Sequence, residues 1–273
     1  MGLGACSAIK LGYGTLPDLA YWWLDGYIDF NETQGPLARQ EITRLHAWHR
    51  QQELPRLGEM LGRLEQLAPG SISPPQACAV VTEVQARMNG VADRAEPAML
   101  GLATTVTARQ LRHLERKYRN NNETFRKDWL DLPASELKDK RYQQMLERAE
   151  KIYGSLDEPQ RVVLRQGIAQ SMYEPQRILA ERQRRQQDLL HTLRRMAEPG
   201  TATDSARTLL RAYLERVQHS PDAGYRSWQD ALVQEGCRMF SAVHESTTAA
   251  QRQQAVRRLR AYQRDLRELS GGH

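Results

Sequence analysis

The spacing of its apolar residues restricts most strongly what this chain can fold into. From residue 15 onward, apolar residues recur every three or four positions, which is the period of an α-helix. No stretch alternates apolar and polar residues between turn dipeptides, as a strand does. The clearest helical stripe consists of Leu54, Leu57, Leu61, Leu64 and Leu67. The sequence therefore predicts an all-α protein, a multi-helix bundle of long and partly kinked helices.

Prolines, glycines and capping residues divide this pattern into separate helices. The clearest helical stretches cover residues 76–105, 108–131, 133–154, 157–198 and 249–269. We expect Pro55 and Pro175 to kink their helices, because proline removes a backbone hydrogen bond. Asp157 is suited to cap a helix, with Gln160 reaching back to it in a capping box.

The chain is long enough to bury a substantial core, in one large domain or two ordinary ones. Residues 1–14 form a short stretch that contains several glycines, which favours a tether. We expect residues 15–273 to form a single elongated helical domain, with a subdivision near residue 106 or 200 as the alternative.

The tether carries the motif Leu3-Gly4-Ala5-Cys6, which resembles a bacterial lipobox. In that motif, small residues precede a cysteine that becomes the lipidated first residue of the mature protein. The charged and apolar segments of an export signal do not precede the motif, so we expect a late recorded start or a removed signal. No run reaches the roughly 18 apolar residues that a membrane span needs. Membrane attachment is therefore expected through lipid on Cys6 alone.

Aromatic residues gather on the helix that follows the tether. One helical face carries Leu19, Trp22, Trp23 and Tyr27. Beside a lipid anchor, an exposed face of this kind would lie on the membrane surface, with Tyr21, Trp22 and Trp23 as the interaction candidates. Three nearby acidic residues would repel anionic lipid, namely Asp18, Asp25 and Asp29. We therefore expect this face to pack into the core rather than contact a membrane.

The cysteines beyond the tether are Cys78 and Cys237. Two cysteines are too few to build a disulfide scaffold, so packing must hold the fold. They could pair in an oxidising compartment, but nothing in the sequence brings them together. We favour two buried thiols over a disulfide.

The charge pattern argues against nucleic-acid binding. The net charge is +6, but 33 acidic residues are present and the arginines alternate with Glu, Gln and Asp along the predicted helices. A duplex-binding protein would concentrate its basic charge on one face. We expect solvated helix surfaces and no nucleic-acid partner.

Catalytic and metal-binding signatures are weak. His46, His49 and Glu53 could share a helix face and contact a metal, but a pair of histidines three apart is a common surface pattern. Serine nucleophile elbows, phosphate-binding glycine loops and paired CxxC motifs are missing, and no carboxylate pair stands out as acid and base. We therefore expect no metal, no cofactor and no catalytic residues.

Two segments carry a resemblance that covers nearly the whole chain. They are Asp18-Leu19-Ala20-Tyr21-Trp22-Trp23-Leu24-Asp25 and the region from Lys117-Tyr118-Arg119 to Gln160-Arg161. Together they resemble an uncharacterised family of proteobacterial lipoproteins, a domain of unknown function. The resemblance implies a lipid-anchored, exported helical protein and brings no active site. Ser7 follows the cysteine, where aspartate would signal inner-membrane retention, so the resemblance implies the periplasmic face of the outer membrane.

A shorter segment, Leu156-Asp157-Glu158-Pro159-Gln160, is similar to the Leu-Thr-x-x-Gln motif of small periplasmic chaperones of the Spy and CpxP type. Aspartate replaces threonine here, and a capping box explains the same residues without kinship. The similarity marks Leu156, Asp157 and Gln160 as candidates for an interaction surface.

These observations predict a non-enzymatic lipoprotein that binds envelope or periplasmic proteins of unknown identity through helical surfaces. One alternative is a chaperone-like protein that binds unfolded clients. The other is an envelope hydrolase whose carboxylates come from separate helices.

Overall fold

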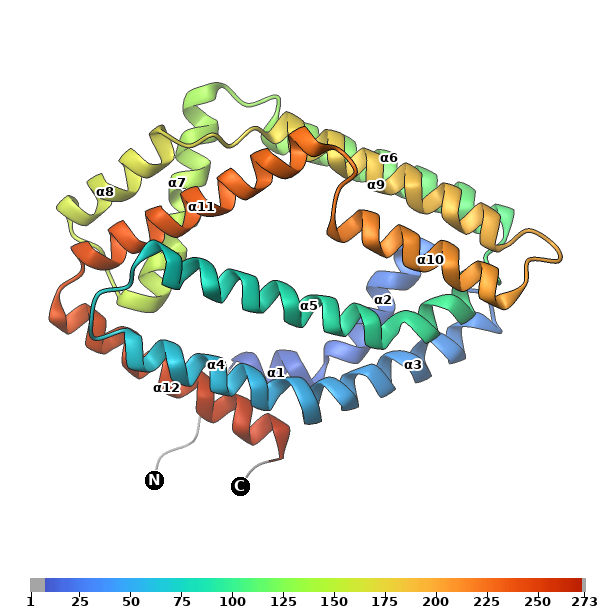
Figure 1. Cartoon of the computed structure of the whole chain (residues 1–273), viewed down its shortest axis with the longest axis horizontal. Helices are drawn as coiled ribbons and strands as arrows, with labels where there is room; N and C mark the ends of the chain where they lie inside the picture. Colours follow the sequence, from blue (N-terminus) through green and yellow to red (C-terminus); the bar gives the residue numbers. More distant parts are fainter. Residues whose placement is uncertain (1–7, 272–273) are drawn as a thin grey trace. The chain divides into compact units, whose positions relative to one another are not determined.

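The computed structural model describes residues 8–271, and this part of the chain folds into helices without strands (Figure 1). The all-α prediction is confirmed. The elements are α1 (Ala8–Gly14), α2 (Leu16–Ile28), α3 (Gln34–Trp48), a π-helical turn η1 (His49–Glu53), α4 (Leu54–Leu67), α5 (Pro74–Ala103), α6 (Ala108–Trp129), α7 (Ala134–Tyr153), α8 (Glu158–Ala169), α9 (Pro175–Met196), α10 (Thr203–Gln218), α11 (Ala223–Ser246) and α12 (Ala249–Ser270).

The chain divides into two compact units, each assembled from three separate stretches of sequence. Unit 1 consists of the described residues up to His49, Met88–Leu130 and Pro175–Arg226. Unit 2 consists of Arg50–Arg87, Asp131–Glu174 and the described residues from Ser227 onward. The sequence placed its alternative subdivision near 106 or 200, and no unit boundary lies there. That residues 15–273 behave as one domain stays a prediction.

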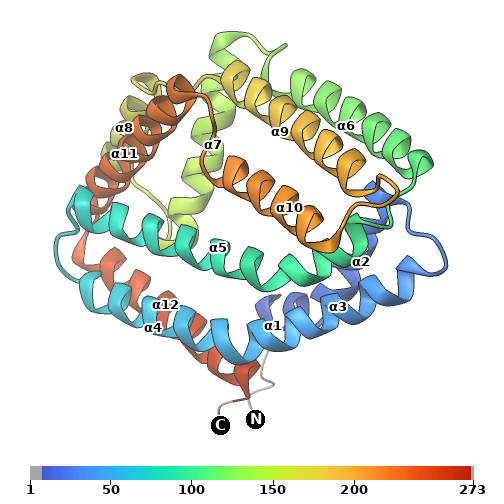
Figure 2. The same cartoon turned by 45° about the vertical axis from the view of Figure 1, so that its right-hand side comes forward.

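Unit 1 is built around helices that pack lengthwise. Helix α9 lies along both α6 and α10, and α2 packs on α3 and α6 (Figure 2). Their inward-facing residues form one apolar core, in which Leu114, Met196 and Ala206 are almost fully buried. This core follows largely from the helical period of the sequence, since most of its members lie on the apolar stripes of their helices, and Val106 joins them from the turn between α5 and α6.

Unit 2 pairs α4 with α12 along most of their lengths, and α7 contacts α8 and α12 (Figure 2). Its core includes Tyr153 and Val256, and it also buries His244. His244 Nε2 lies 2.8 Å from the Gly70 carbonyl, which can only accept, so this nitrogen donates. Nδ1 then accepts from the Tyr153 hydroxyl at 2.8 Å. Burial lowers the pKa of His244, which favours this neutral form.

Each unit ties two helix N-termini together through a pair of glutamines. In unit 1, Gln34 is the first residue of α3 and Gln110 lies in the first turn of α6, and they donate to each other's side-chain oxygens. In unit 2, Gln160 and Gln251 near the starts of α8 and α12 do the same, at 2.7 and 2.9 Å. Gln34, Gln110 and Gln160 are buried, so these amides need their partners. The capping box predicted at Asp157 and Gln160 is confirmed and belongs to this arrangement.

One detail of the predicted helix boundaries is wrong. The helix expected over 157–198 is two helices, because α8 ends at Ala169 and Pro175 begins α9 instead of kinking it. Proline is well placed in a first helical turn, where its missing N–H has no partner to lose. Pro55 lies in the first turn of α4, and the π-helical turn η1 interrupts the regular α-helix just before it, so the kink expected there is not contradicted.

Candidate functional site

The most prominent surface feature of unit 1 is an apolar face on α2. Leu19, Trp22 and Trp23 are exposed by 58%, 63% and 62%, and Leu16 is exposed as well. At 3.6 residues per turn, these four side chains fall within an arc of about 120° on the helix. Exposed large apolar residues are common singly, but a cluster on one helix face marks an interaction surface. We call these four residues the α2 face.

The remainder of α2 is fixed to unit 1. Tyr27 and Ile28 pack against the core, and the Asn121 side chain donates to the Tyr27 hydroxyl at 2.6 Å. Arg39 of α3 lies over the Tyr21 ring, 3.5 Å from its centroid. The expectation that this segment packs into the core is therefore confirmed for Tyr27 and wrong for Leu19, Trp22 and Trp23. A one-dimensional helical stripe cannot show which part of it a neighbouring helix covers.

The aspartates that argued against membrane contact have partners within unit 1. Asp18 forms an ion pair with Arg39 at 3.8 Å. Asp25 accepts a hydrogen bond from the Phe30 backbone N–H at 2.9 Å. Asp29 pairs with Arg109 at 2.7 Å, and this hydrogen bond lowers the pKa of Asp29. Two of these three carboxylates, Asp18 and Asp29, therefore have an arginine partner, whereas Asp25 accepts a backbone hydrogen bond.

His46 and His49 both contact the same residue, Tyr13. His46 Nε2 is 3.1 Å from the Tyr13 carbonyl oxygen, and His49 Nδ1 is 2.9 Å from the Tyr13 hydroxyl. Glu53 is buried and accepts from Arg56 at 2.8 Å. Among residues 8–271, no group of three His, Cys, Asp or Glu side chains is arranged to hold a metal ion.

Leu156, Asp157 and Gln160 have structural roles in unit 2. Leu156 lies in the core, and Gln160 is buried in its pair with Gln251. The Asp157 carboxylate accepts from the Gln160 backbone N–H at 3.0 Å and caps α8. The side chains of Leu156 and Gln160 are thus buried within unit 2. Of the three residues, only Asp157 is exposed.

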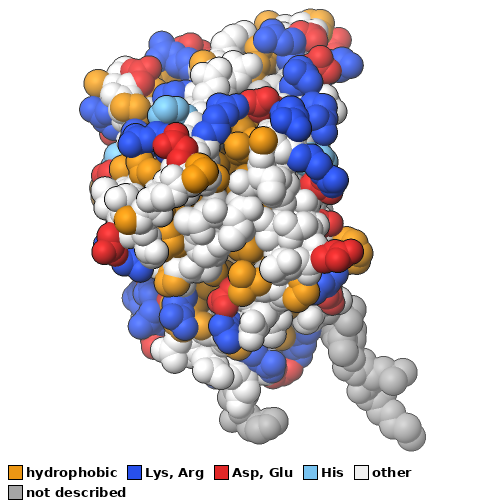
Figure 3. Space-filling model, turned by 90° about the vertical axis from the view of Figure 1, so that its right-hand side faces the viewer, with side chains coloured by type: hydrophobic (Ala, Val, Ile, Leu, Met, Phe, Trp, Pro, Cys, Tyr) orange, Lys and Arg blue, Asp and Glu red, His pale blue; other side chains and the backbone are white. Residues whose placement is uncertain are grey.

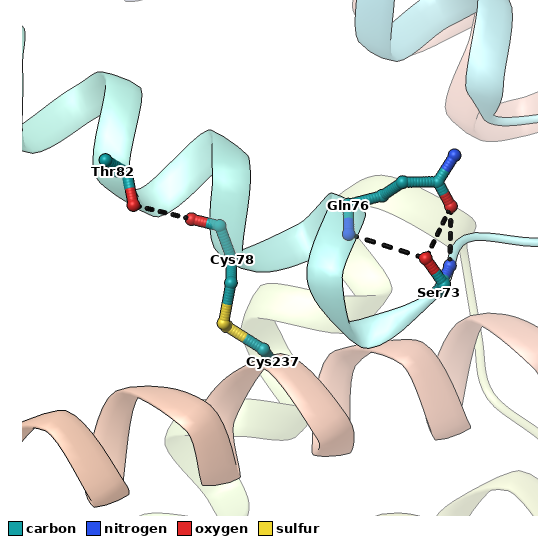
Figure 4. Close-up of a disulfide and its surroundings, with 5 residues drawn as sticks. All are labelled: Ser73, Gln76, Cys78, Thr82 and Cys237. Carbon is teal, nitrogen blue, oxygen red and sulfur yellow. Dashed lines mark hydrogen bonds between the residues drawn. A yellow bond between two sulfur atoms is a disulfide. The ribbon is translucent and has the colours of Figure 1, made fainter.

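Cys78 of α5 and Cys237 of α11 form a disulfide within unit 2, with their Cα atoms 5.5 Å apart (Figure 4). The expectation of two buried thiols is wrong. The sequence could not reveal this pairing, because the cysteines are separated by 159 positions and only the fold brings them together. Cys6, the lipidation candidate, lies outside the described residues.

The most buried acidic groups of unit 1 are held by arginines. Glu181 accepts from Arg184 and Arg185, both at 2.7 Å, and from the Ser220 hydroxyl at 3.0 Å. Although burial alone would raise it, the pKa of Glu181 is lowered by these hydrogen bonds. A general acid needs the opposite shift. The Ser220 hydroxyl instead links Glu181 of α9 to the segment between α10 and α11.

Acidic and basic side chains are also mixed on the surface, as on the face that Figure 3 shows. In unit 2, Arg260 pairs with Glu65 at 2.6 Å and Arg63 with Glu83 at 2.7 Å. In unit 1, Arg211 pairs with Glu96 at 2.9 Å. Much of the arginine content is therefore neutralised locally.

The fold and these surfaces define an all-α protein with exposed apolar surface. The sequence pattern of a family of unknown function (DUF6279) matches residues 26–217, and the chain belongs to this family. No curated protein and no solved structure matches the chain. Among the described residues, no helix combines the length and apolar character required to cross a bilayer.

Proposed function

We propose that this protein is a non-enzymatic lipoprotein, anchored through Cys6 to the periplasmic face of the bacterial outer membrane, and that it binds envelope proteins or other envelope components. The α2 face carries this proposal. It exposes two tryptophans and two leucines, and it begins ten positions after Cys6 in the sequence. An acylated Cys6 would bring such a face to the lipid surface.

The composition of the α2 face suits the water–lipid boundary. Tryptophan is enriched there because its ring is apolar while its indole N–H still reaches water or lipid headgroups. The arginine partners of Asp18 and Asp29 offset part of the repulsion that anionic lipid would otherwise exert. We assign α2 the role of orienting unit 1 on the membrane, with the acyl groups providing attachment.

The Cys78–Cys237 disulfide supports an exported location. Disulfides persist in oxidising compartments such as the bacterial periplasm and are rare in the reducing cytosol. This support is independent of the lipobox, because the disulfide lies in unit 2 and does not involve Cys6.

Vesicle flotation of the 273-residue chain without lipid on Cys6 tests the role of α2. We expect the chain to float with vesicles of phosphatidylethanolamine and phosphatidylglycerol, and the variant carrying Trp22→Ser and Trp23→Ser to stay in solution. Met88→Ser is the matched control, because Met88 is 66% exposed on α5 and lies outside the α2 face. Equal flotation of the tryptophan variant and the control would refute a membrane role for α2.

The chaperone-like version of this function makes a separate prediction. Exposed apolar surface could bind unfolded clients as well as lipid, so equimolar protein should suppress the aggregation of a denatured test client. Suppression that disappears in the Trp22→Ser, Trp23→Ser variant would favour clients over lipid as ligands of the α2 face. Absence of any suppression would remove the chaperone version.

A further inference from the structure

Unit 2 contains an apolar cavity beside the disulfide. It has a volume of about 410 Å³ and lies between the end of α4, the start of α5 and the middle of α11. Cys237 is one of its lining residues, so the Cys78–Cys237 bond fixes the α5 wall to the α11 wall (Figure 4). This volume lies within the range of about 300–1,000 Å³ that is usual for small-ligand sites.

The cavity has a buried floor and an open rim. Ile72 and Cys237 are exposed by only 4% and 3%, whereas Val81 and Phe240 are exposed by 36% and 41%. A ligand could therefore enter between Val81 and Phe240 while part of it stays in water.

The lining offers almost no hydrogen bonds. Apart from Gln76, every lining residue is apolar or glycine. The Gln76 side-chain oxygen already accepts from the Ser73 N–H at 2.9 Å and from the Ser73 hydroxyl at 2.8 Å (Figure 4). A ligand in this cavity thus gains from apolar burial and finds few partners for its own polar groups.

We infer that this cavity binds the single aliphatic chain of a monoacyl lipid, with the headgroup outside the rim. A peptide fits less well, because each backbone N–H and C=O that enters needs a partner which the lining does not supply. An aliphatic chain has no such groups. This inference goes beyond the proposed function: it concerns unit 2 and needs neither lipid on Cys6 nor the α2 face.

Gly236 provides a way to fill the cavity. It lines the cavity on α11, and a Cβ placed on it meets no atom within 4 Å. Gly236→Leu should therefore occupy the binding space, and replacing a helical glycine favours the helix. Gly58→Leu is the matched control: Gly58 lies on α4 in the same unit, has the same open surroundings and does not line the cavity.

The experiment measures displacement of 11-(dansylamino)undecanoic acid from the 273-residue chain by octanoic, decanoic and dodecanoic acid below their micelle concentrations. We expect affinity to rise about fourfold for each added methylene, the effect of burying one CH₂. Dodecylphosphocholine should bind about as tightly as dodecanoic acid, because both headgroups stay in water. Gly236→Leu should weaken binding by roughly tenfold or more, while Gly58→Leu leaves it unchanged.

Three results would overturn the inference. One is an affinity that does not depend on chain length. The second is a Gly236→Leu variant that binds like the wild type. The third is a Gly58→Leu variant that loses binding as much as Gly236→Leu does, with circular dichroism confirming that both variants are folded. A tightly bound peptide of apolar residues, displaced by no monoacyl lipid, would assign the cavity to a protein partner instead.

Discussion

Removal of the Cys78–Cys237 disulfide is expected to destabilise the protein strongly. The crosslink joins positions 159 apart, so it restricts a large part of the unfolded chain. In the chain-entropy description, closing a loop of this length stabilises the folded state by about 5 kcal/mol, and native disulfides commonly contribute about 2–4 kcal/mol. We therefore expect a loss of about 3–5 kcal/mol in the variant carrying Cys78→Ala and Cys237→Ala.

Urea unfolding followed by circular dichroism measures this loss. With a denaturant dependence of about 3 kcal/mol per molar urea, the midpoint should fall by about 1 M or more. Wild type in excess reductant should unfold at nearly the same urea concentration as the double variant, and a Cys6→Ser control should unfold like oxidised wild type. Equal midpoints for oxidised wild type and the double variant would refute the reasoning.

The glutamine pairs and the ion pairs of α9 make two further predictions. Gln110→Ala removes the amide that donates to the Gln34 side-chain oxygen and to the Asp29 carbonyl, and it opens the capping box of α6. This should lower the free energy of unfolding by about 1–3 kcal/mol in the same urea assay; a smaller loss would contradict the role of the pair. Arg216 hydrogen bonds to Asp188 and lowers the pKa of that carboxylate below 3.8, so the pair stabilises the folded state above this pH and loses its effect as pH falls further. Thermal unfolding between pH 5 and 2 should show a smaller loss of stability for Asp188→Asn than for wild type, and equal slopes would contradict this.

Much of the fold could be predicted from the sequence because local signals specify helices. The Leu54–Leu67 stripe and the capping box at Asp157 need only the residues within one or two turns, and both are present in the structure. Pro175 was misread for a related reason: a proline begins a helix as readily as it kinks one, and the choice depends on whether Gln170 and Ser171 before it remain helical.

The candidate sites were less predictable because they depend on contacts between distant positions. Cys78 and Cys237 meet only through the packing of α5 and α11, and no local signal records that. The exposure of Trp22 and Trp23 depends on which side of α2 is covered by α3 and α6. The apolar cavity had a partial signal, since Val80 and Val81 are apolar residues of the helix expected over residues 76–105, but Phe240 joins them only in the folded unit.

Lipid on Cys6 is the central claim, and intact-mass analysis combined with membrane fractionation tests it most directly. The precursor is expressed with an export signal in a Gram-negative host, beside a Cys6→Ser variant. The account predicts a triacyl mass increment on Cys6 and sedimentation with the outer membrane, both lost in the variant. An unmodified wild-type protein that remains in the cytoplasmic fraction would contradict it.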